Sequence, residues 1–274
     1  MGFNSYWLPQ QVDLDALMVA PRLSMAAPAL EIGVGVVPMQ SRFPVHMAQA
    51  ARTADFLSPG PFTLGLGVEH DWVVRDMWGL PFDRPVTEMT EYLRVVLDLL
   101  RNGASQHQGD FYRVSTFTSR LPPAPRLPVL LGALGPRMLD LAGSVADGTI
   151  TWLAGVETVT SHIVPRVTAA AERAERPTTR IVVILPVAVT DEPDRVAEEI
   201  DTAFDLFTHQ RSYQTTMARE NATRPSQVSI IGTARHVSDQ LARLEASGVT
   251  DFVAIRFGSD SERERTTNAI TSPT

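Results

Sequence analysis

Short apolar segments alternate along the chain with longer segments in which apolar residues recur every three or four positions. Most of the short segments are continuous apolar runs, as expected for parallel strands that are buried on both faces. The expected strands cover residues 3–8, 31–37, 62–68, 129–133, 148–153, 180–189 and 251–257. This alternation predicts βαβ units and a parallel sheet.

Three of the longer segments carry helix signals, and two of them have clear boundaries. One starts at Pro85 and stops at Gly103, because proline suits the first helical position and glycine commonly ends a helix. Another carries its apolar stripe through residues 196–207. In the third, Thr233 is a candidate N-cap and Gly248 marks the end.

The length of the chain allows one or two domains and suits a single barrel, and the strand count is one short of the eight that a closed barrel needs. A TIM-type (β/α)8 barrel occupies about 250 residues, and this chain has 274. We therefore expect a single α/β barrel domain over residues 1–258, with seven recognisable strands, and a polar C-terminal tail over residues 259–274. Two long connections, residues 106–128 and 213–231, are candidates for functional flaps.

Charge and hydropathy limit the partners. The formal net charge of −7 argues against nucleic-acid binding, which depends on clustered positive charge. The sequence shows no apolar run long enough to span a bilayer, no basic amphipathic helix and no secretory signal. We therefore expect a cytoplasmic protein that acts on a small molecule, without a nucleic-acid or membrane partner.

Two missing residue types limit the chemistry further. The chain has no Cys, which excludes thiol nucleophiles, iron–sulfur clusters and thiolate metal sites. All 24 basic residues are Arg, so Schiff-base enzymes and P-loop NTPases, which need a lysine, are excluded as well. The six His residues lack the spacing of metal ligands, and we expect no metal site. A cofactor that brings its own reactivity suits this composition.

Side chains at the C-terminal ends of the strands are the first candidates for a ligand site. Trp7 ends the first strand, where it can form a flat wall for a ring or serve as a core aromatic, and Trp152 ends the fifth strand, where we expect it to border the pocket. Arg42 follows the second strand, where it can hold an anionic group or lie on the surface. Glu69 and His70 follow the third strand as candidate proton-transfer groups, the alternative being a structural histidine.

The turn after the fourth strand is the most specific feature. Gly135 lies near the N-cap of the following helix, Pro136 takes its first position, and Arg137 adds positive charge. Free amides at a helix start bind phosphate well. A tight strand-to-helix turn without a ligand is the alternative interpretation.

Four segments carry a specific family pattern: residues 64–70 (LGLGVEH), 77–81 (MWGLP), 131–139 (LGALGPRML) and 141–152 (LAGSVADGTITW). They resemble the luciferase-like monooxygenase superfamily, and most closely its coenzyme F420-dependent oxidoreductase branch. The likeness extends from residue 2 to about residue 257. It implies a TIM barrel in which a reduced deazaflavin or flavin lies across the C-terminal mouth.

The resemblance also assigns site residues. Val36, Val37 and Pro38 would back the ring, and Gly67, Glu69 and His70 would line its edge. The phosphate of the tail would be held by Ala133, Leu134, Gly135 and Pro136. Relatives often have a strained, sometimes cis, peptide in the first of these segments. Further candidates for cofactor contact are Trp7, Arg42, Arg137 and Trp152.

The chain departs from the family pattern in two places. Members normally carry a strand and a helix before the segment that matches residues 3–8, so we expect the barrel to lack its first β/α unit. Several F420 enzymes have an Asp-His pair after that strand, and Gln10-Gln11 stands there in this chain. His70, together with Glu69, is therefore the expected acid–base group.

These features favour an F420-dependent oxidoreductase that transfers a hydride between a deazaflavin and a small organic substrate. One alternative is a monooxygenase that uses reduced FMN. The other is a non-catalytic cofactor-binding or partner subunit of the same fold. The sequence also leaves a homodimer open.

Overall fold

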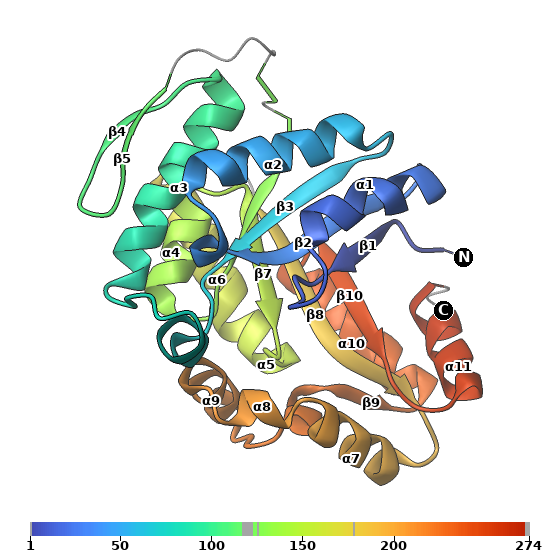
Figure 1. Ribbon diagram of the computed structural model, residues 1–274. Helices are drawn as coiled ribbons and strands as arrows, with labels where there is room; N and C mark the ends of the chain where they lie inside the picture. Colours follow the sequence, from blue (N-terminus) through green and yellow to red (C-terminus); the bar gives the residue numbers. More distant parts are fainter. Residues whose placement is uncertain (1, 117–122, 125, 178, 272–274) are drawn as a thin grey trace. The chain divides into compact units, whose positions relative to one another are not determined.

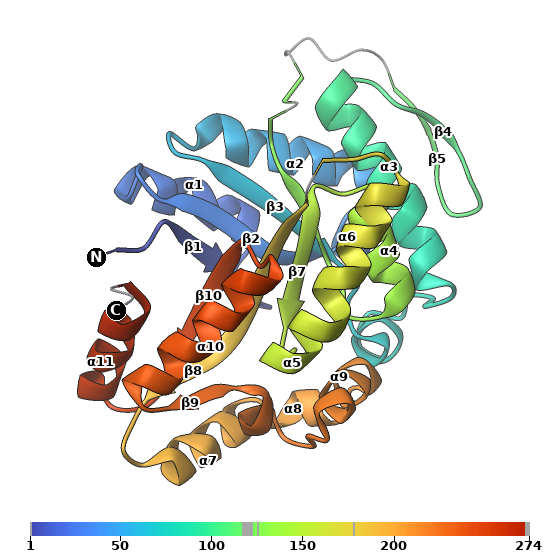
Figure 2. The ribbon, with the colours of Figure 1, turned by 180° about the vertical axis from the view of Figure 1, so that it is seen from behind.

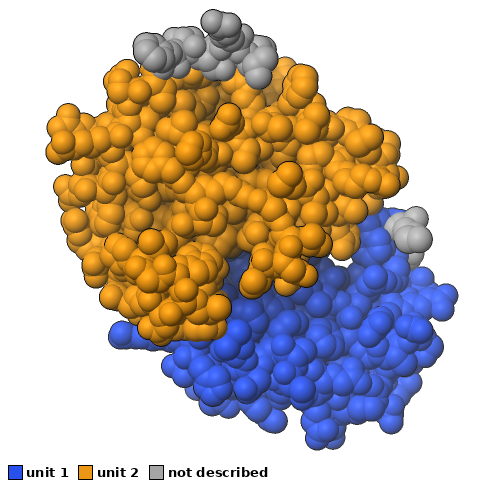
Figure 3. All heavy atoms as spheres, in the orientation of Figure 1, with its two compact units in different colours: residues 1–3, 133–274 blue, residues 4–132 orange. Residues whose placement is uncertain are grey.

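The structure is a computed structural model that describes residues 2–116, 123–124, 126–177 and 179–271 (Figures 1 and 2). The chain forms two compact units, which Figure 3 distinguishes by colour. Unit 1 consists of residues 1–3 and 133–274, and unit 2 consists of residues 4–132. Each unit contains parallel strands that are connected by helices.

Unit 2 has four parallel strands, paired in the order β1-β2-β3-β6. They are β1 (Ser5–Leu8), β2 (Glu31–Pro38), β3 (Phe62–Gly67) and β6 (Val129–Gly132). The helices are α1 (Ala16–Ala26), α2 (Pro44–Leu57) and α3 (Pro85–Asn102), with the short segments η1 (Met39–Ser41) and η2 (Val73–Met77). All residues of β3 are buried, as expected for a strand between two neighbours.

In unit 1 the central strand is β8, which pairs in parallel with three others. The strands are β7 (Gly148–Trp152), β8 (Arg180–Val189), β9 (Ile230–Gly232) and β10 (Asp251–Arg256). The helices are α4 (Pro136–Ser144), α5 (Val156–Thr158), α6 (Val164–Arg173), α7 (Pro193–Ala203), α8 (Asp205–Thr208), α9 (Arg211–Met217), α10 (Ala234–Ser247) and α11 (Asp260–Thr271). Shorter turns are η3 (Val159–Ile163), η4 (Ala218–Glu220) and η5 (Pro225–Val228).

The strand and helix predictions hold closely. All seven expected strands are present, and their ends move by at most two residues. The two predicted glycine stops have left-handed backbone conformations, with φ of 75° at Gly103 and 105° at Gly248. Thr233 caps α10 by accepting the N–H of His236. The stripe through residues 196–207 is interrupted at Phe204, where α7 ends and α8 begins.

The first long connection contains a hairpin, formed by β4 (Gln106–Gln108) and β5 (Arg113–Ser115). Glu91 of α3 fixes its turn, because the carboxylate accepts backbone N–H groups at 2.9, 2.9 and 3.1 Å. The donors are Asp110, Phe111 and Tyr112. Residues 117–122 and 125 of this connection lie outside the described residues. The second connection contains η4, η5 and most of α9.

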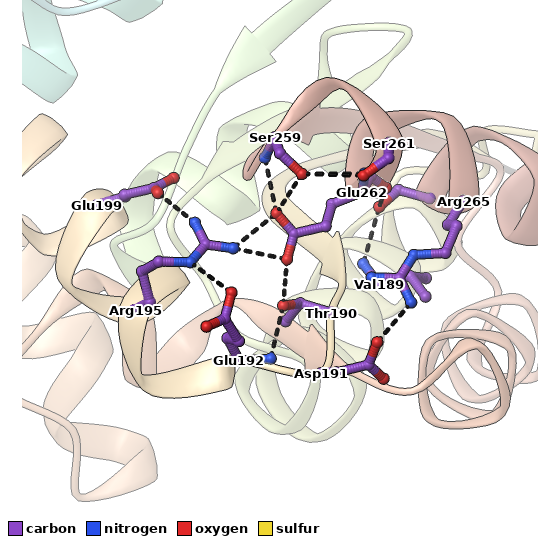
Figure 4. Close-up of polar contacts among 11 residues, drawn as sticks. Val189, Thr190, Asp191, Glu192, Arg195, Glu199, Ser259, Ser261, Glu262 and Arg265 are labelled. Atoms are coloured by element: carbon purple, nitrogen blue, oxygen red, sulfur yellow. Dashed lines mark hydrogen bonds and ion pairs between the residues drawn. The ribbon is translucent and has the colours of Figure 1, made fainter.

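Most of the expected C-terminal tail is helical, because a buried carboxylate anchors α11 (Figure 4). Both oxygens of Glu262 lie 2.7 Å from Nη2 of Arg195 on α7. The carboxylate also accepts the hydroxyl of Thr190 and the backbone N–H of Ser259. These two donors lower the pKa of Glu262 to about 2. A polar sequence thus forms an anchored helix, since its one buried charge is fully hydrogen-bonded.

Two absences concern the described part of the chain. None of its helices has the combined length and apolar character that crossing a membrane requires. Within the same residues, no group of three His, Asp or Glu side chains is arranged to hold a metal ion.

Candidate active site

The end of β2 in unit 2 is shaped by the side chain of Val36. The peptide bond between Gly35 and Val36 is cis, at the start of the segment in which relatives have a strained and sometimes cis peptide. A Cβ atom placed on Gly67 of β3 would lie only 2.4 Å from Cγ2 of Val36, and one on Gly132 of β6 would lie 3.1 Å from its Cγ1. Val36 therefore lies across both glycines, in space that larger residues would fill. Val37 and Pro38, which follow Val36 in β2, are buried.

Trp7 lies against the neighbouring strand. Its indole covers Gly33, where an added Cβ would lie 2.4 Å from Cε3 of the ring. The side chain is 8% exposed, and Nε1 donates to the hydroxyl of Ser5 at 3.1 Å. This packing shows a core role for Trp7; its contact with a cofactor stays a prediction.

Arg42 is held from two sides in unit 2. Its guanidinium forms an ion pair with Asp15, which also caps α1 by accepting the N–H of Leu17 at 3.0 Å. Its backbone carbonyl accepts the hydroxyl of Tyr92 at 3.0 Å. Nη1 of Arg42 is buried, and none of the described residues accepts a hydrogen bond from it. That Arg42 holds an anionic group remains a prediction.

Glu69 and His70 lie after the end of β3, and each donates its backbone N–H to a side-chain oxygen. The N–H of Glu69 donates to Oε1 of Gln40 at 3.1 Å, and Oε1 of Glu69 accepts the N–H of His70 at 2.9 Å. Burial lowers the pKa of His70, and the negative charge of Glu69 opposes the shift. The imidazole is therefore neutral at neutral pH and can accept a proton.

The turn into α4 belongs to unit 1 and is open. The carbonyl of Gly135 accepts the N–H groups of Met138 and Leu139 at 3.1 and 3.0 Å, so the helix starts where the sequence predicts. A Cβ placed on Gly135 would meet no atom within 4 Å. Pro136 and Arg137 are exposed beside it. Within the described part of the chain, no side chain thus occupies the space next to Gly135.

Behind this turn, Ala133 and Leu134 are less accessible. The N–H of Ala133 donates to the carbonyl of Ile150 at 3.2 Å, which ties the turn to β7. Ala133 is buried and Leu134 is partly exposed. The position of the two residues is therefore fixed by the strand that follows in sequence.

Trp152 ends β7 and packs against aromatic rings of unit 1. Its ring centroid lies 4.9 Å from that of Phe204 and 5.8 Å from that of Phe207, both edge-on. Phe207 in turn packs on Tyr213, and Phe204 on Phe257. The sequence indicates the position of Trp152 at a strand end but not its aromatic partners, because Phe204 and Phe207 continue an apolar stripe typical of a helix face. Contact of Trp152 with a cofactor stays a prediction.

Three further residues around the candidate site carry no clear functional signal in the sequence: Gln40, Asp15 and Tyr92. Of these, only Asp15 has a readable pattern, since an acidic residue before an apolar run is typical of an N-cap. Gln40 and Tyr92 contribute through contacts between segments that are distant in sequence.

Comparison with known proteins adds evidence on family. A sequence model described as luciferase-like monooxygenase matches residues 1–251. A Mycobacterium tuberculosis protein named as a coenzyme F420-dependent oxidoreductase is 28% identical over 56% of this chain and 47% of its own length. The 5,10-methylenetetrahydromethanopterin reductase of Archaeoglobus fulgidus is 25% identical over 54% of this chain and 45% of its own. The chain thus spans about half the length of these curated relatives.

A solved structure bears on the fold. The coenzyme F420-dependent tetrahydromethanopterin reductase of Methanopyrus kandleri has a TM-score of 0.76, at 19% identity, over 99% of this chain and 90% of that chain. The expected TIM-type barrel fold class is confirmed by this likeness.

Proposed function

The chain belongs to the luciferase-like monooxygenase family, and on that premise we propose that it is an oxidoreductase that binds coenzyme F420 and transfers a hydride between this deazaflavin and a small organic substrate. The supporting observation is the open turn at Gly135, where a Cβ would meet nothing within 4 Å. Backbone amides at an unobstructed helix start suit a phosphate group. The similarity to proteins named for F420 favours this cofactor.

The residues present fit a flat ring with an anionic tail. Val36 lies across Gly67 and Gly132 with part of its side chain exposed, which offers a smooth apolar surface to a ring. Nε2 of Gln40 and Nη1 of Arg42 are buried donors without a hydrogen-bond partner among the described residues. A ring with carbonyl acceptors would satisfy donors of this kind.

We assign the holding of the cofactor to three groups of residues. Those that would support the ring are Val36, Val37, Pro38 and Gly67, and those that would hold the phosphate are Ala133, Leu134, Gly135 and Pro136. Trp7, Arg42, Arg137 and Trp152 are further contact candidates. Bound F420 supplies the hydride donor or acceptor, so the chain itself has only to orient the substrate and move a proton.

That proton transfer is assigned to His70. A neutral imidazole nitrogen of His70 can accept the proton that a substrate hydroxyl loses on oxidation, and the protonated ring returns it in the reverse direction. Glu69, with a negative charge beside the ring, stabilises the imidazolium that forms. Burial lowers the pKa of His70 from the ordinary histidine value of 6.5. The neutral form, which acts as the base, therefore persists to a lower pH than in a freely exposed histidine.

A titration with both cofactors tests the proposal. F420 and FMN are each added to the apoprotein while the fluorescence of the cofactor is followed. We expect saturable F420 binding with a dissociation constant in the micromolar range, about −8 kcal/mol, and much weaker FMN binding. Tight FMN binding without F420 binding would instead support a flavin monooxygenase. Failure to bind either cofactor would overturn both interpretations in favour of a non-catalytic subunit.

A further inference from the structure

Gln40 connects the loop after β2 to the residues that follow β3, and no sequence motif marks it. It lies in η1 (Met39–Ser41), which continues β2 directly. The hydroxyl of Ser41 donates to the carbonyl of Pro38 at 2.7 Å and so closes this short turn. Oε1 of Gln40 accepts the N–H of Glu69 at 3.1 Å. The side-chain amide of Gln40, in the loop after β2, therefore holds the backbone of the loop after β3.

A second bond extends this connection to the backbone of His70, whose imidazole is the candidate base. Oε1 of Glu69 accepts the N–H of His70 at 2.9 Å. The carbonyl of His70 then accepts the N–H of Val74 at 3.0 Å, where η2 begins. Gln40, Glu69 and His70 thus form one continuous chain of hydrogen bonds within unit 2.

The amide of Gln40 is used on one side only. Because Oε1 accepts a backbone N–H, the orientation of the amide is fixed and Nε2 can act only as a donor. Nε2 is buried, and no acceptor for it lies among the described residues. The contact between the two loops therefore depends on Oε1 alone, the atom that the variants below remove or keep.

We propose that Gln40 is a positioning residue, which holds the backbone of Glu69 and through it sets the place of the His70 imidazole. The assignment of a proton-transfer role to His70 rests on the proposed function, whereas the positioning itself does not. Without the acceptor at Oε1, the Glu69 N–H loses its partner, and the segment after β3 that contains Glu69 and His70 is free to move. The imidazole then becomes more solvated, and its pKa rises toward the ordinary value because less burial opposes its charged form.

Three variants separate this role from general destabilisation. Gln40→Met keeps the length of the side chain but removes the acceptor. Gln40→Glu keeps an acceptor for the Glu69 N–H and serves as the conservative rescue. Gln49→Met makes the same change at an exposed position of α2 and is the matched control.

The measurement is an NMR titration of the imidazole of His70 in the apoprotein, with its signal identified by loss in a His70→Asn variant. We expect Gln40→Met to raise the His70 pKa by about half a unit and to shift the Glu69 backbone amide signal. Gln40→Glu should keep the Glu69 amide signal close to that of the unmodified protein, and Gln49→Met should change neither quantity. An unchanged His70 pKa and Glu69 signal in Gln40→Met would overturn the proposal.

Kinetics distinguish this proposal from the proposed function. If the protein turns over with F420, Gln40→Met should lower kcat by about tenfold at saturating F420, whatever affinity for F420 is lost with Nε2. If the protein binds no F420, the proposed function fails, and the apoprotein titration still decides whether Gln40 positions His70.

Discussion

At the end of β2, Val36 packs so closely on two glycines of unit 2 that neither glycine can be enlarged without moving Val36 or the backbone. Val36 lies across Gly67 and Gly132, and a methyl group on Gly67 would lie 2.4 Å from Cγ2 of Val36. Both glycines are buried or partly buried within strands, so the surrounding backbone cannot give way easily. The shape of this surface is thus set by steric exclusion.

Replacement of Gly67 by alanine tests this packing. We expect Gly67→Ala to lower the free energy of unfolding by about 1–3 kcal/mol, because the new methyl group forces Val36 or the backbone aside. Adding Val36→Ala should recover much of that loss by removing the opposing methyl groups. Chemical denaturation of the single and double variants measures both effects.

Gly135→Ala is the matched control for this experiment. Its added methyl group meets no atom within 4 Å, and φ of −79° suits any residue. Its free energy of unfolding should therefore stay within about 1 kcal/mol of the unmodified value. Equal losses in Gly67→Ala and Gly135→Ala, or no recovery in the double variant, would contradict the steric account.

Residues in the candidate site differ in how far the sequence reveals them. The alternating glycines of β3 indicate an open strand face, and Glu69 and His70 are readable because they follow the end of that strand. The bond between Gln40 and Glu69 is not readable, since it depends on how two loops 29 residues apart meet. The pairing of Arg42 with Asp15 is hidden for the same reason.

At the scale of elements, capping chemistry explains why the helix boundaries are predictable. Gly103 and Gly248 adopt left-handed conformations that favour glycine, and Thr233 supplies a side-chain cap. The break between α7 and α8 carries no comparable signal, because Phe204 and Phe207 preserve the apolar spacing across it. Packing of both rings on Trp152 is a tertiary effect that local pattern does not contain.

The anchor of α11 predicts a dependence of stability on pH. The pKa of Glu262 is lowered to about 2 in the folded protein, against an ordinary value of 4.5. The carboxylate therefore contributes stability that is fully present above pH 4.5 and is lost as the pH falls toward 2. Glu262→Gln should lower the free energy of unfolding at pH 7 by about 2 kcal/mol, because the charged bonds to Arg195 and Thr190 weaken.

The control is Asp191→Asn. It removes the exposed ion-pair partner of Arg265, which lies on α11 like Glu262. Its effect should stay below about 1 kcal/mol, as is typical of surface ion pairs. Denaturation curves at pH 7 and near pH 3 measure the difference. The anchor account would be wrong if Glu262→Gln and Asp191→Asn behaved alike, or if Glu262→Gln lost as much stability on acidification as the unmodified protein.

At the scale of the whole molecule, the strand pattern was enough to predict a parallel α/β sheet, and the family resemblance was needed to predict the barrel. Continuous apolar runs that alternate with amphipathic segments permit few arrangements, and the likeness to the solved reductase confirms the barrel class. Helix α11 shows the limit of this approach, because a polar segment becomes ordered through one buried carboxylate. The identity of the substrate is likewise outside what strand and helix patterns encode.

The most direct test of the account addresses the phosphate contact at the start of α4. Gly135→Asp places a carboxylate in the open space where the tail of F420 is proposed to bind. Fluorescence titration compares F420 with a deazaflavin that lacks the phosphate-bearing tail. We predict about 30-fold weaker binding of F420, roughly 2 kcal/mol, and an effect within about twofold on the tail-less ring. Unchanged F420 binding, or equal losses for both ligands, would contradict the account.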